Sequence, residues 1–215
     1  MPALRPYAPP PADLLTTLHC DDAVLIANKP SGLLSVPGRG PEKAICAHSI
    51  LNERHDPVLT VHRLDMDTSG IMIFARTKDA QRALSRQFER RTVGKTYEAL
   101  VQGNVAESQG TIDKAIAKHS LDRPLRHLDP AGQTAITHWQ VLDRSTAATR
   151  LLLKPETGRS HQLRLHLASI GHPILGDVFY GDPKSHNRLC LHAKSLSFQH
   201  PITDEKQDFT TVTPF

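Results

Sequence analysis

Short apolar runs separated by turn residues predict most of the secondary structure of this chain. Runs rich in β-branched and aliphatic residues, several of them alternating with polar positions, are typical of strands. The first stops at Lys29-Pro30 and turns at Ser31-Gly32. The predicted strands cover residues 23–29, 69–77, 96–103, 111–117, 135–143, 149–156 and 191–198.

Three stretches have the spacing of helices instead. They lie at residues 44–54, 78–91 and 158–171. The third ends at Gly171, and its apolar positions Leu163, Leu167 and Ile170 fall on one face. Strands in runs with few crossover helices favour an α+β fold, with a mixed, mainly antiparallel sheet and flanking helices.

The domain organisation follows from the two ends of this pattern. Five prolines fall within the first eleven residues, and no apolar signal-peptide core accompanies them. We therefore expect a loose leader at residues 1–18 and one domain at residues 19–215. The polar stretch 118–134 exceeds an ordinary connector, which favours a functional loop or a disordered insertion.

Charge is concentrated in one part of the chain. Residues 76–95 contain seven Lys or Arg and two Asp or Glu, a net charge of +5, whereas the remainder of the +4 chain sums to −1. In the predicted helix 78–91, Arg82, Arg86 and Arg90 recur every four residues on one face. Such a face can bind a polyanion, although a merely solvated basic face remains the alternative.

Apolar runs and cysteine positions indicate the cellular compartment. The longest apolar runs are far too short to cross a bilayer. The cysteines, at positions 20, 46 and 190, form no C-x-x-C pair, which favours reduced thiols and a cytoplasmic protein.

Most motifs for chemistry are absent. The histidines lack the spacing of a helical zinc pair, no P-loop or G-x-G-x-x-G occurs, and no nucleophile elbow is present. We therefore expect neither a metal nor a nucleotide cofactor. One acid stands out: Asp65 in VHRLDMDTSG, residues 61–70, which is either a catalyst or a structural loop acid.

Five separated segments resemble, in order and spacing, the motifs of RluA-type pseudouridine synthases. The resemblance runs from about residue 20 to the end and is closest to the subgroup that modifies a 23S ribosomal RNA hairpin and position 32 of the tRNA anticodon arm. Its segments are NKPSGLLSVPGR (28–39), HRLDMDTSG (62–70), GKTYEALVQG (94–103), KPETGRSHQLRLHLASIGHPILGDVFYG (154–181) and LCLHA (189–193).

The resemblance implies a cofactor-free isomerisation of uridine to pseudouridine. By the match of HRLD, Asp65 is the catalytic aspartate, and the arginine of HQLR, Arg164, is its cationic partner. Tyr97 corresponds to the tyrosine that stacks on the target base, and Leu163 to an apolar wall of the uracil pocket. A buried carboxylate needs such a partner to stay ionised.

Other residues are implied in RNA binding. Arg63 corresponds to the arginine that enters the space left by a flipped-out uridine. The basic helix with Arg82, Arg86 and Arg90 would hold phosphates, and Lys29, Arg159 and His161 would contact RNA nearer the site.

The expected partner is structured RNA, a 23S hairpin or the tRNA anticodon arm or both, with no DNA or membrane and with a monomeric enzyme. Three alternatives remain: the same chemistry on another uridine, a non-catalytic RNA-binding relative, and a histidine- or metal-dependent nuclease. The intact Asp65, Tyr97 and Arg164 argue against the non-catalytic relative, and the lack of a metal motif argues against the nuclease.

Overall fold

The computed structural model describes residues 6–118 and 125–215 and divides the chain into two compact units. Among the described residues, the Asp65 unit comprises residues 6–95 together with Ala193–Pro214, and the Arg164 unit comprises Thr96–His192 with Phe215. The boundaries at Lys95–Thr96 and at His192–Ala193 fall inside strands, so the chain passes between the units there without a separate linker.

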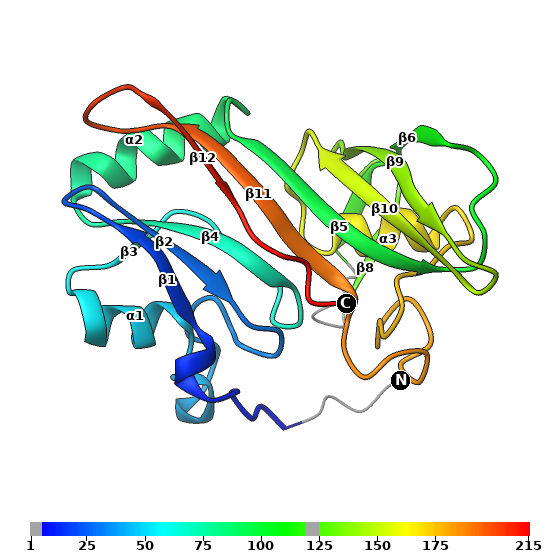
Figure 1. Cartoon of the computed structure of the whole chain (residues 1–215), viewed down its shortest axis with the longest axis horizontal. Helices are drawn as coiled ribbons and strands as arrows, with labels where there is room; N and C mark the ends of the chain where they lie inside the picture. The colour runs from blue at the N-terminus through cyan, green and yellow to red at the C-terminus, as the bar shows by residue number, and fades with distance from the viewer. Residues whose placement is uncertain (1–5, 119–124) are drawn as a thin grey trace. The chain divides into compact units, whose positions relative to one another are not determined.

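The Asp65 unit is built on antiparallel strands. Strand β2 pairs with β1 on one side and β4 on the other, β3 adds to β4, and β12 pairs with β11. Figure 1 shows β12 running along β11. The bounds are β1 Thr16–Cys20, β2 Val24–Lys29, β3 Leu59–Thr60, β4 Ser69–Ala75, β11 Leu191–Gln199 and β12 Lys206–Thr210.

Two α-helices and two short 3-10 helices complete this unit. The α-helices are α1, Ala47–His55, and α2, Lys78–Glu89; the 3-10 helices are η1, Ala12–Leu14, and η2, Pro41–Lys43. The side chain of Thr77 caps α2 by accepting the Ala80 N–H at 3.1 Å. Helix α2 buries Ala80 and Leu84 against a core that includes Ile73 of β4.

The Arg164 unit is also built on antiparallel strands, in which β10 pairs with β5 and β9, and β6 pairs with β9. Strands β7 and β8 form a separate pair. Helix α3 places Leu163 and Leu167 in the core with Leu151 and Leu153 of β10. The bounds are β5 Gly94–Gln102, β6 Gln109–Asp113, β7 Ile116–Lys118, β8 Arg126–Leu128, β9 Ile136–Arg144, β10 Ala148–Pro155 and α3 Gln162–Ala168.

The predicted α+β class with a mainly antiparallel sheet is confirmed. All seven predicted strand regions contain strands, although the run at residues 111–117 is divided between β6 and β7. The terminal strands β1 and β12 were missed because their residues are largely exposed and lack an apolar run. Helix α3 starts later than predicted, because His161 has a left-handed backbone (φ 58°) that a helix cannot include.

The proline-rich leader is held to the Asp65 unit over its described part. The Tyr7 hydroxyl donates to the Ile45 carbonyl at 2.9 Å and accepts the Leu34 N–H at 3.1 Å. Arg54 donates to the carbonyls of Ala12 and Leu15. The proline-rich segment has no run of apolar residues that would predict packing against the domain. These side-chain hydrogen bonds nevertheless hold its described part in place. Part of the polar stretch expected as a loop or insertion lies outside the described residues, and the described part contains β8.

Within the described part of the chain, every helix is too short or too polar to cross a bilayer.

Gly70 provides a test of this packing. Its φ of +115° is unfavourable for other residues, and an added Cβ would overlap the backbone of Ala193. Gly32 also has a positive φ, +83°, but an added Cβ there would meet no atom within 4 Å. We expect Gly32→Ala to lower the free energy of unfolding by about 1–2 kcal/mol, and Gly70→Ala by about 3 kcal/mol or more because overlap adds to the strain.

Urea unfolding followed by circular dichroism compares the two variants. Equal losses of stability would show that the close approach of Gly70 to Ala193 has no energetic weight.

Candidate active site

Asp65 lies in the loop that connects β3 to β4. The Thr68 N–H donates to the Asp65 carbonyl at 3.2 Å, which closes a tight turn before β4 begins at Ser69. The Asp65 side chain is half-buried, and the Arg63 side chain two residues earlier is exposed. The loop thus presents an acid and a cation from one short segment.

Lys29 supports this loop from beneath. Its side chain is 0% exposed, and its ammonium donates to the carbonyls of Pro30, Leu33 and Met66 at 3.0, 2.7 and 2.9 Å. The Gly32 N–H adds a bond to the Met66 carbonyl at 3.0 Å. We expected Lys29 to contact RNA, but a fully buried ammonium does not reach the surface. Its position gives it a structural role instead.

Two serines of the same motif hold the loop on either side of Asp65. The buried Ser35 hydroxyl donates to the Leu64 carbonyl at 2.7 Å and accepts the Leu64 N–H at 3.1 Å. The Ser31 hydroxyl donates to the Asp67 carbonyl at 2.7 Å. Segment 28–39 is therefore a cradle that fixes the main chain before and after Asp65.

His62, at the start of the loop, is anchored to the sheet and to α2. The Ile73 N–H donates to its Nε2 at 3.1 Å, and its ring stacks on Phe88 with centroids 4.7 Å apart. Burial, together with the nearby positive charge of Lys95, lowers the pKa of His62 to about 3. The imidazole is therefore neutral at physiological pH.

In the Arg164 unit, Arg164 forms a buried two-point ion pair with Asp177. Its Nε and Nη2 donate to the carboxylate at 2.8 and 2.6 Å, and both side chains are at most 2% exposed. Burial alone would raise the pKa of Asp177, but Arg164 and the N–H groups of Phe179 and Tyr180 outweigh it and lower this pKa. The guanidinium also lies 5.0 Å from the Phe179 ring centre.

His161 precedes α3 and packs against the rings of Phe179 and Tyr180. Its Nδ1 lies 2.9 Å from the Tyr180 hydroxyl, and its ring stacks on Phe179 with centroids 5.5 Å apart. The side chain is mostly buried. Its expected contact with RNA stays a prediction. Segment 177–180 therefore holds both His161 and Arg164 at the start of α3.

Tyr97 and Leu163 meet the same core in the Arg164 unit. Tyr97 pairs with Leu153 across the β5–β10 ladder and is half-buried against the cluster that contains Leu163. Arg159 is half-buried, and its Nε donates to the Thr134 carbonyl at 3.1 Å. The structure thus gathers Tyr97, Leu163 and Arg164 within one unit, although they come from two distant motifs.

Helix α2 and its C-cap residue Arg90 carry arginines on the exposed side, as the spacing predicted. Arg82, Arg86 and Arg90 are all exposed, and Arg82 donates to Asp79 at 2.6 Å. A groove of about 600 Å³ runs between α2 and the turn after β11. Its lining includes Arg82 and Arg86 on one side and Pro201 and Ile202 on the other.

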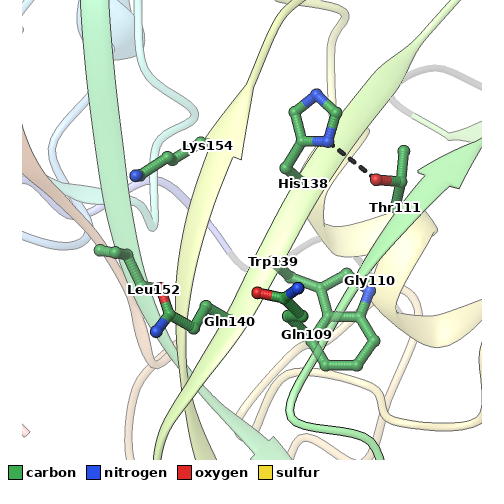
Figure 2. A pocket seen from close by; sticks show the side chains of 8 residues that line it. All are labelled: Gln109, Gly110, Thr111, His138, Trp139, Gln140, Leu152 and Lys154. Atoms are coloured by element: carbon green, nitrogen blue, oxygen red, sulfur yellow. Dashed lines mark hydrogen bonds between the residues drawn. The ribbon is translucent and has the colours of Figure 1, made fainter.

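A further hollow of about 350 Å³ lies on the sheet of the Arg164 unit (Figure 2). His138 is bonded to Thr111 there at 2.8 Å and to Glu156 at 2.6 Å. None of the residues predicted for the site lines this hollow, so its size does not make it the candidate active site. Its lining residues are Gln109, Gly110, Thr111, His138, Trp139, Gln140, Leu152 and Lys154.

Sequence reasoning did not single out Asp177, which binds Arg164, or His62, which anchors the loop with Asp65 to β4. Both stand inside the quoted motif segments, His62 in HRLD and Asp177 in GDVFYG. A buried arginine requires an acid nearby. If Arg164 is buried, a carboxylate such as Asp177 must therefore lie beside it. The choice among the scattered carboxylates needed the fold.

Known proteins are similar to this chain over most of its length. It is 45% identical to the "Dual-specificity RNA pseudouridine synthase RluA" of Pasteurella multocida, over 99% of this chain and 100% of the relative. It is 40% identical to the protein of the same name from Escherichia coli K12, over 97% and 98%. The solved structure of "Human RNA Pseudouridylate Synthase Domain Containing 1" superposes with a TM-score of 0.81 at 29% identity, covering 97% of this chain and 87% of the human one.

The family of RNA pseudouridylate synthases matches residues 23–169, which include the loop with Asp65, the strand with Tyr97 and the helix with Arg164. With relatives of this identity over nearly the full length, the chain belongs to the RNA pseudouridylate synthase family, among its RluA-type enzymes.

Proposed function

We propose that this enzyme isomerises a uridine in structured RNA with Asp65 as its catalytic carboxylate. The N1–C1′ glycosidic bond breaks, the base rejoins the ribose through C5, the C5 proton is lost, and N1 gains a proton. Asp65 either attacks C1′ or removes the C2′ proton, and both routes begin with an ionised carboxylate. No cofactor is required by either route.

The observation that carries this proposal is the fixed main chain on both sides of Asp65. Ser35 holds Leu64, and Lys29 with Gly32 holds Met66, while the Arg63 side chain stays exposed. A carboxylate that reacts with a ribose must be placed accurately, because small errors in position cost large factors in rate. A loop acid that only caps a turn would not require this support.

Arg63 fits a role in base flipping. A uridine in a stem-loop is stacked, so the enzyme must move it out before the ribose can be reached. An exposed, flexible cation two residues before Asp65 can fill the vacated space and contact neighbouring phosphates. We propose that Arg63 enters the RNA while Asp65 meets the sugar.

Arg164 is proposed as the cation that keeps Asp65 ionised once RNA excludes water. Asp177 binds Arg164 through Nε and Nη2 and so fixes the plane of the guanidinium. Tyr97 and Leu163, which share a core cluster, are proposed to form the stacking surface and apolar wall for the uracil.

We propose that α2, with Arg82, Arg86 and Arg90, holds RNA phosphates outside the pocket, and that Arg159 and His161 contact RNA nearer to it. The relatives named above carry the words "dual-specificity". On that similarity and the motif resemblance, we propose that the enzyme modifies both a 23S ribosomal RNA hairpin and position 32 of tRNA. We further propose that it acts in the cytoplasm as a monomer.

Asp65→Asn should abolish turnover and leave the RNA dissociation constant within about threefold, because the amide is neutral and nearly the same shape. The measurement is tritium release from RNA labelled at uridine C5, on separate unmodified tRNA and 23S fragments. Asp67→Asn, in the same loop, is the matched control and should keep its activity. Release by Asp65→Asn at the wild-type rate would remove Asp65 from catalysis, and release from a single RNA would limit the target range.

Asp177→Asn should lower the single-turnover rate at least about tenfold, because Arg164 loses its charged anchor and its fixed orientation. The free energy of unfolding should fall by about 3 kcal/mol, since a buried charge loses its partner. Asp182→Asn is the control, because Asp182 is exposed and lies only five residues further along the chain. A folded Asp177→Asn enzyme with the wild-type rate would show that Arg164 needs no positioning by Asp177.

Replacement of Arg82, Arg86 and Arg90 by Gln should weaken RNA binding and reduce the slope of log K against log salt by about 2. The reason is that fewer phosphate contacts form, so binding releases fewer counterions. The exposed pair between Arg82 and Asp79 does not prevent such contacts, because a surface ion pair is worth at most about 1 kcal/mol.

The control for that experiment is replacement of Lys114, Lys184 and Lys206 by Gln, which removes the same charge from exposed positions elsewhere. An equal change of slope in both triple variants would assign the effect to net charge instead of to α2.

A further inference from the structure

His62 holds a place in the fold that no role described above explains. Strand β3 ends at Thr60, two residues before His62, so this part of the chain has left the β3–β4 ladder. There the His62 ring supplies Nε2 as acceptor for the Ile73 N–H in the middle of β4. All seven residues of β4 are buried, so the anchor is a rigid strand.

The other end of the same loop is also fixed to the sheet. Gly70 is the register partner of Lys29 in the β2–β4 ladder, and Ile73 is the partner of Ile26. The loop with Arg63 and Asp65 therefore starts and ends on one pair of strands, with His62 as its first attachment. Without that attachment, the loop would be held only from Leu64 onwards, where Ser35 binds its main chain.

The His62 ring also reaches α2. It stacks on Phe88 at a centroid distance of 4.7 Å and an interplanar angle of 20°. Lys95 also lies over the Phe88 ring, with its Nζ 5.9 Å from the ring centre. His62, Phe88 and Lys95 thus join the HRLD loop, the basic helix and the GKTY strand in one contact.

We propose that His62 is a positioning residue that couples α2 to the catalytic loop, setting the main chain from which Arg63 and Asp65 extend. This inference rests on the proposed function, in which α2 holds RNA and Asp65 performs the chemistry. RNA binding at α2 is then transmitted through Phe88 to His62, the residue that precedes Arg63.

The chemistry of the ring agrees with a geometric role. Because Nε2 accepts a hydrogen bond, the neutral ring carries its proton on Nδ1. Its pKa of about 3 keeps it uncharged at neutral pH, so the acceptor for the Ile73 N–H is present there. A protonated ring would lose its acceptor and repel Lys95.

The test separates the two contacts of the ring. His62→Phe keeps a ring on Phe88 and loses the acceptor, whereas His62→Gln keeps an amide oxygen as acceptor and loses the stack. Phe88→Leu leaves His62 in place and removes its stacking partner. His48→Gln is the matched control, because His48 is also half-buried and its Nε2 contacts a backbone group, the Val58 carbonyl, at 3.0 Å.

Single-turnover pseudouridine formation, the RNA dissociation constant and urea unfolding are measured for each variant. We expect the maximal rate of His62→Phe to fall by about 10- to 100-fold, since a small displacement of a reacting group has effects of this order. His62→Gln should recover part of that loss, and Phe88→Leu should fall by a smaller factor. The dissociation constants should stay within about threefold, and His48→Gln should match wild type.

A folded His62→Phe enzyme with the wild-type maximal rate would overturn the proposal. If that variant does not fold, wild-type rates in both His62→Gln and Phe88→Leu would overturn it equally. Loss of stability without loss of rate per folded molecule would make His62 a packing residue only. Failure of the wild-type enzyme to form pseudouridine on any RNA would instead refute the proposed function, and the two failures are thereby distinguished.

Discussion

The buried ammonium of Lys29 is the interaction on which the loop around Asp65 depends. A cation taken out of water is costly unless polar groups replace its hydration. Here the carbonyls of Pro30, Leu33 and Met66 converge on it. The requirement acts in both directions, because the same bonds that satisfy Lys29 draw the turn after β2 and the loop before β4 together. Loss of the amine would remove this donor from all three carbonyls, while the Met66 carbonyl would keep its bond from the Gly32 N–H.

Arg164 and Asp177 present the same constraint in the other unit. Each charge is buried, and each would be unfavourable without its partner. Asp177 also accepts the N–H groups of Phe179 and Tyr180 at 2.8 and 3.1 Å, which ties the pair to the segment that contacts His161. In each unit, a buried charge therefore fixes a proposed site residue or the main chain next to one. Lys29 binds the loop around Asp65, and Asp177 binds Arg164. The exposed charges of α2 are different, because they remain hydrated and available to phosphates.

Local pattern determined a large part of the fold. Period-two and period-3.6 spacing identified the buried strands and helices, because burial on one face leaves a repeat in the sequence. Strands β1 and β12 lie at exposed positions and leave no such repeat. The start of α3 was misplaced because the left-handed backbone of His161 has no marker such as glycine.

The sequence by itself determined the class of fold, the basic face of α2 and, through its motifs, the family and the roles proposed for Asp65, Tyr97 and Arg164. Tertiary structure alone decided what the polar members of those motifs do. Lys29 was expected to contact RNA and is instead buried beneath the loop. Asp177 binds Arg164, and His62 anchors the start of the loop to Ile73 of β4. The reason is physical: a motif states which side chain is present, whereas its burial and its partners come from segments far away in the chain.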